Sequence, residues 1–227
     1  MQDYSRYAIY YAPQPGPLAD FAAAWLGWDP ARGISVPHPA LPGLPRPVSE
    51  ITESPRKYGF HGTLKPPMRL AGGREALQGD LQALAARLAP VTLPGLALSR
   101  IGSFLALTID GDAAPLARLA GEVVAALDAH RAPPSEAELA RRRSARLSPA
   151  QEANLARWGY PYVMEEFKFH LTLSGKLAFG EAETVAEALR PALAPLLPQP
   201  FEIRELCLFG EAEDGRFHLI HRYALTG

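Results

Sequence analysis

The chain has 227 residues, of which 48% are hydrophobic and 21% are charged, and its formal net charge is −1. This composition is typical of a soluble globular protein, with enough sequence for one large domain or two small lobes. It argues against a protein that acts mainly by clamping polyanionic nucleic acid, which would usually be clearly basic, but it allows a local basic cleft.

The first half of the sequence alternates strand and helix patterns. Residues 6–12 are rich in β-forming side chains, and residues 17–26 have apolar residues at helical spacing. Prolines crowd residues 36–47, which we predict to be an irregular surface loop, because proline lacks the amide hydrogen and fixes φ. The role of this loop, as a lid or otherwise, stays open. The other elements predicted in this half are a strand over 58–65, a helix over 73–89 and a strand pair over 96–101 and 104–110.

The second half repeats this order and adds a helical segment. Two of the added helices begin at capping boxes, Ser135 with Glu138 and Ser148 with Gln151. We interpret residues 132–160 as an insertion. The elements predicted in this half are helices over 114–130, 135–146 and 149–158, a strand over 167–174, a helix over 181–194 and a strand pair over 201–209 and 216–225.

A short motif occurs once in each half. The sequence FHGTL at 60–64 is repeated as FHLTL at 169–173, and each copy stands in a strand that is followed by a helix and a strand pair. Two copies predict a duplicated α+β unit. We therefore predict one two-lobed α+β domain with a pseudo-twofold axis, with lobes over 1–112 and 113–227.

The repeated motif pairs a histidine with a threonine on one face of a strand, because residues i and i+2 point the same way. His61 is paired with Thr63 in this sense, and His170 with Thr172. A single His-x-Thr would be an ordinary structural pair, but two copies at equivalent places favour a site. If the lobes pack about a twofold axis, both pairs face one cleft. One imidazole can then act as base and the other as acid in a phosphoryl displacement, with threonine hydroxyls bound to phosphate oxygens.

Further residues near the motifs are candidates for substrate binding. Lys65 and Lys168 have the strand parity of the motif residues and can supply positive charge, the alternative being solvated charges at strand ends. Ser174 shares the face of the second motif, and Tyr58 leads into the first. The basic run over 141–146 is either a solvated helix face or a contact to phosphate or RNA.

The two motifs resemble the paired H-x-T/S-hydrophobic motifs of the 2H phosphoesterase superfamily, which includes RNA 2′,3′-cyclic phosphodiesterases and the bacterial LigT-like proteins. The longer stretches KYGFHGTLKPP at 57–67 and FKFHLTLSG at 167–175 are more closely similar to the DUF1045 group, which is associated with phosphonate metabolism.

This resemblance implies antiparallel sheets that flank a central cleft, with helices outside. It implies that His61 and His170 are the catalytic pair and that Thr63 and Thr172 bind phosphate. It also implies a substrate from phosphonate breakdown, such as 5-phosphoribosyl 1,2-cyclic phosphate. The resemblance leaves open which histidine is the acid. Residue 62 is glycine where its counterpart, 171, is leucine, so the two motifs are not equivalent in packing.

We therefore expect a metal-independent cyclic phosphodiesterase, a phosphoric diester hydrolase, that acts on a small ribose or nucleotide cyclic phosphate. One alternative is an RNA end-processing 2′,3′-cyclic phosphodiesterase or ligase, against which the near-neutral composition argues mildly. Another is a phosphate-ligand binding protein without catalysis, which would not need two matched proton carriers. We expect no metal, no cofactor and no obligate protein partner.

The sequence also suggests a cytoplasmic location. Cys207 is the single cysteine, which excludes an internal disulfide and is compatible with a reducing compartment. The first residues show no basic segment followed by an apolar stretch, so we expect no signal peptide. No apolar run approaches the roughly 20 residues of a membrane helix, so we expect no membrane association.

Overall fold

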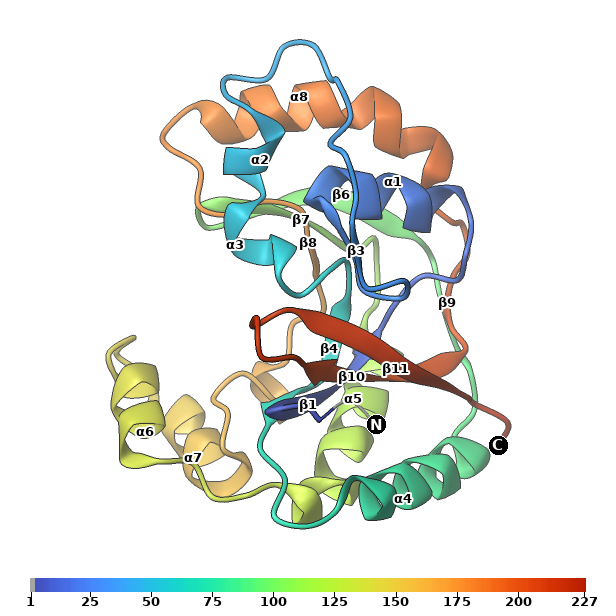
Figure 1. The fold of residues 1–227 in the computed structure, drawn as a ribbon, viewed down its shortest axis with the longest axis vertical. Coiled ribbons are helices and arrows are strands. Elements are labelled where there is room, and N and C mark those ends of the chain that lie inside the picture. The colour runs from blue at the N-terminus through green and yellow to red at the C-terminus, as the bar shows by residue number, and fades with distance from the viewer. Residues whose placement is uncertain (1–2) are drawn as a thin grey trace.

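A computed structural model describes residues 3–227 and shows one antiparallel sheet of seven strands with helices packed against it (Figure 1). This confirms the α+β class. The strands across the sheet are β11 (Phe217–Ala224), β10 (Glu205–Glu211), β1 (Arg6–Tyr11), β4 (Gly62–Met68), β8 (Leu171–Thr172), β7 (Phe104–Ile109) and β6 (Leu96–Ile101). Two small ribbons lie outside it, β2 (Trp28–Asp29) with β3 (Ile34–Ser35), and β5 (Val91–Leu93) with β9 (Phe201–Ile203).

The long helices form where the apolar spacing predicts them. Ser135 and Ser148 each accept a hydrogen bond from the backbone amide three residues on, which confirms both capping boxes. Four-residue helices leave no periodic signal, so α2 and α3 were not predicted. The helices are α1 (Pro17–Leu26), α2 (Val48–Ile51), α3 (Glu53–Arg56), α4 (Arg74–Arg87), α5 (Ala114–Ala126), α6 (Glu136–Arg143), α7 (Pro149–Trp158) and α8 (Glu181–Leu193).

The two predicted motif strands are displaced or shortened. The first begins at Gly62 instead of residue 58 and continues through Pro66 and Pro67, where we had expected it to end. The second is reduced to Leu171 and Thr172. Each histidine of the motifs thus lies immediately before the first residue of its strand.

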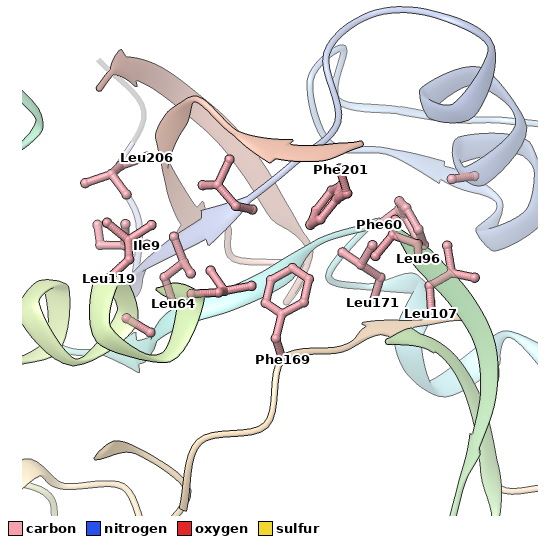
Figure 2. Packing of buried hydrophobic residues seen from close by; sticks show 14 of the residues in the cluster. Ile9, Phe60, Leu64, Leu96, Leu107, Leu119, Phe169, Leu171, Phe201 and Leu206 are labelled. Carbon is pink, nitrogen blue, oxygen red and sulfur yellow. The ribbon is translucent and has the colours of Figure 1, made fainter. Parts of the chain in front are cut away.

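The apolar residues of both motifs are buried in one core. Phe60, Leu64, Phe169, Leu171 and Leu173 are each at most 6% exposed. Figure 2 shows Phe60, Phe169 and Leu171 in the same cluster as Phe201, and the rings of Phe169 and Phe201 have their centroids 6.0 Å apart. Because side chains alternate along a strand, this burial places the motif histidines and threonines on the opposite face.

The predicted boundary between lobes at residue 112 is wrong. Strands β4 and β8 pair at the centre of the sheet, and each hairpin adds to strands of the other half of the sequence: β7 pairs with β8, and β10 pairs with β1. Each side of the sheet is therefore built from both halves of the chain. The sequence repeats motif, helix and hairpin, but the hairpin of each half pairs with a strand of the other half.

The predicted loop and insertion both have the expected character. Residues 36–47 contain no helix or strand. Helices α6 and α7 lie at one side of the molecule, away from α8 and α1 (Figure 1). Within residues 3–227, none of the helices has both the length and the apolar character required to cross a membrane.

Candidate active site

A cleft with a volume of about 580 Å³ lies where β4 and β8 meet. His61, Thr63 and Thr172 are part of its wall. Another part comes from α6 and from the segment over 160–162. None of the residues over 36–47 lines this cleft, so the structure gives no support to a lid role for the proline-rich loop.

The register of β4 and β8 brings the two motifs together. Gly62 is paired with Leu171 in an antiparallel ladder. In such a ladder, the residue before one partner lies opposite the residue after the other. Continued by one residue to either side, this register puts His61 opposite Thr172 and Thr63 opposite His170.

Both imidazoles are held in the same way by the backbone. The Nδ1 atom of His61 lies 2.9 Å from the carbonyl oxygen of Gly59, and the Nδ1 atom of His170 lies 2.8 Å from that of Lys168. A carbonyl oxygen only accepts hydrogen bonds, so each Nδ1 is the donor and carries the proton. Each Nε2 atom is then free to accept or transfer a proton in the site.

His61 is enclosed by aromatic rings. Its ring centroid lies 4.0 Å from that of Tyr10, with 30° between the planes, and 5.7 Å from that of Tyr58. Burial is the main cause that lowers the pKa of His61 to about 4, and the nearby His170 lowers it further, although the hydrogen bond to Gly59 opposes the shift. His61 is therefore neutral at pH 7, which suits a proton acceptor.

His170 stands beside the cleft and is not part of its lining. Its ring centroid is 5.9 Å from that of Phe104, which does line the cleft. The charge of a protonated His170 would lower the pKa of His61. The structure thus places His61, Thr63 and Thr172 in the wall of one cleft, and His170 stands next to the paired position of β4 and β8.

The prediction that Lys65 reaches the cleft is wrong. Its side chain is 2% exposed, and its Nζ atom donates a hydrogen bond to the carbonyl oxygen of Val124, 3.0 Å away, and lies 3.5 Å from Oδ1 of Asp128. The pairing with β1 has irregular steps on both sides of Ile9, which is paired with Lys65. A bulge of this kind shifts the alternation of side chains by one residue and turns Lys65 toward α5.

The other three predicted binding residues have different outcomes. Tyr58 lines the cleft and packs near His61. Ser174 also lines the cleft, but its hydroxyl accepts a hydrogen bond from the amide of Leu105 and donates one to the carbonyl of Gly175, so it is not a free donor. Lys168 is exposed and is absent from the lining. It contributes its carbonyl group to the site rather than its ammonium group.

The cleft contains residues that sequence reasoning missed. Arg6 and Tyr10 lie four residues apart on the same face of the first strand, which alternation along 6–12 would have indicated. The basic run over 141–146 was noted, but helical spacing alone did not show which of its residues face the cleft. Two of them, Arg141 and Arg142, line the cleft, and so does Lys176, which lies outside the run. Within residues 3–227, no cluster of three or more His, Cys, Asp or Glu side chains is arranged to hold a metal ion.

Comparison with known proteins gives one family and two curated relatives. Residues 63–218 match the family described as "Protein of unknown function (DUF1045)". A protein of Janthinobacterium sp. (strain Marseille) called ribose 1,5-bisphosphate phosphokinase PhnN is 39% identical over 185 residues, which are 80% of this chain and 41% of the relative. A protein of the same name from Laribacter hongkongensis (strain HLHK9) is 35% identical over 214 residues, which are 92% of this chain and 49% of the relative. The chain spans about half the length of these relatives.

A solved structure aligns along the whole chain at low identity. The crystal structure of E. coli LigT complexed with 3′-AMP covers 99% of this chain and 100% of its own, with 15% sequence identity and a TM-score of 0.44.

Proposed function

The chain belongs to the DUF1045 family, and from the geometry of its cleft we propose that it is a phosphodiesterase that opens a cyclic phosphate on a ribose or nucleotide. The observation that carries this proposal is the group of two histidines and two threonines on one face of the β4–β8 pair. Two imidazoles with matched backbone hydrogen bonds and free Nε2 atoms are suited to proton transfer at both ends of a displacement at phosphorus.

In the proposed mechanism, His61 is the base and His170 is the acid. The neutral His61 takes a proton from water through Nε2 while the water oxygen attacks phosphorus. The bond from phosphorus to one ribose oxygen breaks, and the Nε2–H of protonated His170 donates its proton to that oxygen. The hydroxyls of Thr63 and Thr172 donate hydrogen bonds to the non-bridging phosphate oxygens, where negative charge increases. The products are a phosphate monoester and a free hydroxyl group.

The size and charge of the cleft support a small phosphorylated substrate. A volume of about 580 Å³ is in the range of small-molecule sites. An RNA end-processing enzyme would need a basic path that continues from the cleft along 141–146. Arg143, in the middle of this run, forms an ion pair with Glu152 at 2.6 Å. This pairing interrupts such a path and favours the small substrate.

The names of the two relatives support a substrate related to phosphorylated ribose. Those names describe a kinase, but the chain spans about half of each relative and contains no G-x-x-x-x-G-K-[ST] phosphate loop. We infer that the shared half acts on a ribose phosphate related to the one in that name, and that this chemistry belongs to phosphonate metabolism.

The test is turnover of 2′,3′-cyclic nucleotides and ribose 1,2-cyclic phosphates in the presence of EDTA. We expect hydrolysis that survives chelation and falls by about 10²–10⁴-fold in His61→Ala and in His170→Ala. A protein that only binds phosphate ligands would show affinity without turnover, and His61→Gln would change that affinity little. Loss of turnover on chelation, or full activity in both variants, would contradict the mechanism.

A further inference from the structure

The two motif histidines have matching backbone hydrogen bonds but different neighbours. The ring centroids of His61 and Tyr10 are 4.0 Å apart with 30° between the planes, so these two rings are stacked. The ring centroid of Phe104 is 5.9 Å from that of His170 and its plane is turned by 54°, which gives no such overlap. Within residues 3–227, a stack of this kind is present at the first motif and not at the second.

The register of the sheet shows where this difference originates. β1 lies beside β4, and β7 lies beside β8. Tyr10 of β1 is paired with Thr63, whereas Ala106 of β7 is paired with Thr172. Side chains of paired residues lie on the same face of the sheet. The strand that flanks each motif therefore presents a tyrosine in one case and an alanine in the other, and a methyl group is too short to stack on an imidazole.

The ring of Tyr10 is fixed by aromatic neighbours of its own. Tyr10 is 1% exposed, and its ring centroid lies 5.1 Å from that of Phe209 and 6.1 Å from that of Phe217. The ring of Tyr58 lies 5.0 Å from Phe217 and 5.7 Å from His61, so these side chains form a closed circuit of rings around the imidazole. A ring in such a close-packed cluster cannot move without displacing its neighbours.

The stack supplies a restraint on His61 that its hydrogen bond does not. The bond from Nδ1 to the carbonyl oxygen of Gly59 holds one edge of the imidazole. The χ2 torsion of histidine has broad energy wells, so one bond leaves the ring free to tilt. Tyr10 covers one face of the ring and removes this freedom. His61 is nevertheless only half-buried and lines the cleft, so part of the imidazole stays accessible to a ligand.

Tyr10 covers His61 without adding charge. Burial raises the pKa of Tyr10 well above its usual value of 10, so its phenol is neutral near pH 7. Burial is also the main cause of the low pKa of His61, about 4, to which a charge on His170 contributes less. The ring of Tyr10 is part of the cover that keeps water from His61, and Ala106 offers His170 no comparable cover.

On the basis of the proposed function, we infer that Tyr10 is a positioning residue, whose ring holds His61 with Nε2 toward the reacting phosphate and makes His61, rather than His170, the base. The ring performs this role and the hydroxyl group is not required, since the contact is between ring faces. The division of labour between two similar motifs then follows from one position in the flanking strands, Tyr10 against Ala106.

NMR of protein with 15N-labelled histidine tests this inference without turnover. In Tyr10→Leu, which keeps apolar bulk without a ring, the Nδ1–H proton of His61 should exchange with water about tenfold faster, and the pKa should rise from about 4 toward 6.5. Tyr10→Phe should restore both values. The matched control is Tyr11→Leu, which removes a ring from the opposite face of β1, where it packs on Phe169 and Phe201. This control should leave both signals of His61 as in wild type.

Kinetics then connect the stack to catalysis. With adenosine 2′,3′-cyclic phosphate, kcat of Tyr10→Leu should fall about ten- to hundredfold while KM stays within about threefold, because the base is displaced and the threonine contacts remain. Tyr10→Phe should recover most of this loss. A loss in Tyr10→Phe as large as in Tyr10→Leu would assign the effect to the hydroxyl group and overturn the inference.

The remaining outcomes separate this inference from the proposed function. Wild-type exchange and pKa of His61 in Tyr10→Leu would overturn the inference whether or not the protein is active. If Tyr10→Leu does not fold, the wild type decides, because the ring current of a stacked tyrosine shifts the C–H protons of His61 upfield, and unshifted protons would exclude the stack. The expected NMR result without turnover of any cyclic phosphate would refute the proposed function and the assignment of the base, but it would support the hold of Tyr10 on His61.

Discussion

Gly62 is in direct contact with the ring of Phe169, which belongs to the other motif. A Cβ atom placed on Gly62 would lie 2.3 Å from Cε2 of Phe169 and 2.4 Å from its Cζ. The absence of a side chain at 62 therefore allows β4 and β8 to approach at the one position where they pair, Gly62 with Leu171. It also explains why the first motif has glycine where the second has leucine.

We predict that Gly62→Ala destabilises the protein by about 1–3 kcal/mol, because a methyl group at this position overpacks a buried ring. Urea unfolding at pH 7 measures the effect. The matched control is Gly79→Ala in α4, where an added Cβ meets nothing within 4 Å and alanine is the better helix former. Partial recovery in the double variant Gly62→Ala/Phe169→Leu would locate the clash at Phe169. Equal stability of Gly62→Ala and wild type would contradict the close approach.

A second prediction concerns the displaced lysine. Lys65→Ala removes a buried side chain and its hydrogen bond to Val124, and we expect it to lower the free energy of unfolding by about 2–4 kcal/mol. Because Lys65 does not line the cleft, kcat/KM of the folded variant should stay within about threefold of wild type.

The control for this prediction is Lys168→Ala. Lys168 is exposed, so its replacement should change stability by no more than about 0.5 kcal/mol. Unfolding in urea and steady-state kinetics on the same preparations give both quantities. A Lys65→Ala variant with wild-type stability and a large loss of activity would restore the sequence-based role of Lys65 in substrate binding.

The pairing of each histidine with its threonine could be predicted because it depends only on residues that are close together in the sequence. Strand alternation places His61 with Thr63 and His170 with Thr172, and the burial of Phe60 and its counterparts confirms that alternation. Lys65 lies only two residues beyond Thr63, yet a bulge reverses its direction. A bulge depends on the partner strand β1, more than fifty residues away in the sequence, and so it leaves no local signal.

The strand pairing across the two halves and the composition of the cleft wall could not be predicted, because both depend on contacts between residues far apart in the sequence. The repeat of motif, helix and hairpin suggested two successive lobes, but each hairpin pairs with strands from the other half of the chain. The contact between Arg142 and Tyr160 joins α6 to a segment beyond α7. Local periodicity shows that a helix is present, whereas the surface against which it packs depends on the whole fold.

The third prediction is a loss of stability in acid that originates at His61. Its pKa is about 4 in the folded protein, whereas an unperturbed histidine has a pKa near 6.5. Above pH 6.5 the residue is neutral in both states and costs nothing. Between pH 6.5 and 4 mainly the unfolded state takes up the proton, so stability falls as the pH is lowered, by about 3 kcal/mol for this group.

Urea unfolding of wild type and His61→Gln at pH 7, 5.5 and 4 tests this prediction. Wild type should lose about 3 kcal/mol more than His61→Gln over this range, because glutamine does not titrate. The loss of ring packing on Tyr10 shifts the His61→Gln curve by a constant amount, so the readout is the difference in slope. Parallel curves would show that His61 is as hydrated as a free imidazole.

The last prediction assigns the base by the pH dependence of catalysis. If His61 is the base, kcat/KM should decline on the acidic side near pH 4 rather than near pH 6.5, since this limb reports the pKa of the base in the free enzyme. The reverse assignment is disfavoured, because an imidazole with a pKa of about 4 is protonated in only about one molecule in a thousand at pH 7.

Tyr58→Ala opens one side of the His61 ring to water and should move the acidic limb of kcat/KM toward higher pH. Tyr162→Ala, at an exposed position of the same cleft, should leave the limb in place. If kcat/KM of the wild type instead declined near pH 6.5, and this decline disappeared in His170→Ala, His170 would be the base and His61 the acid.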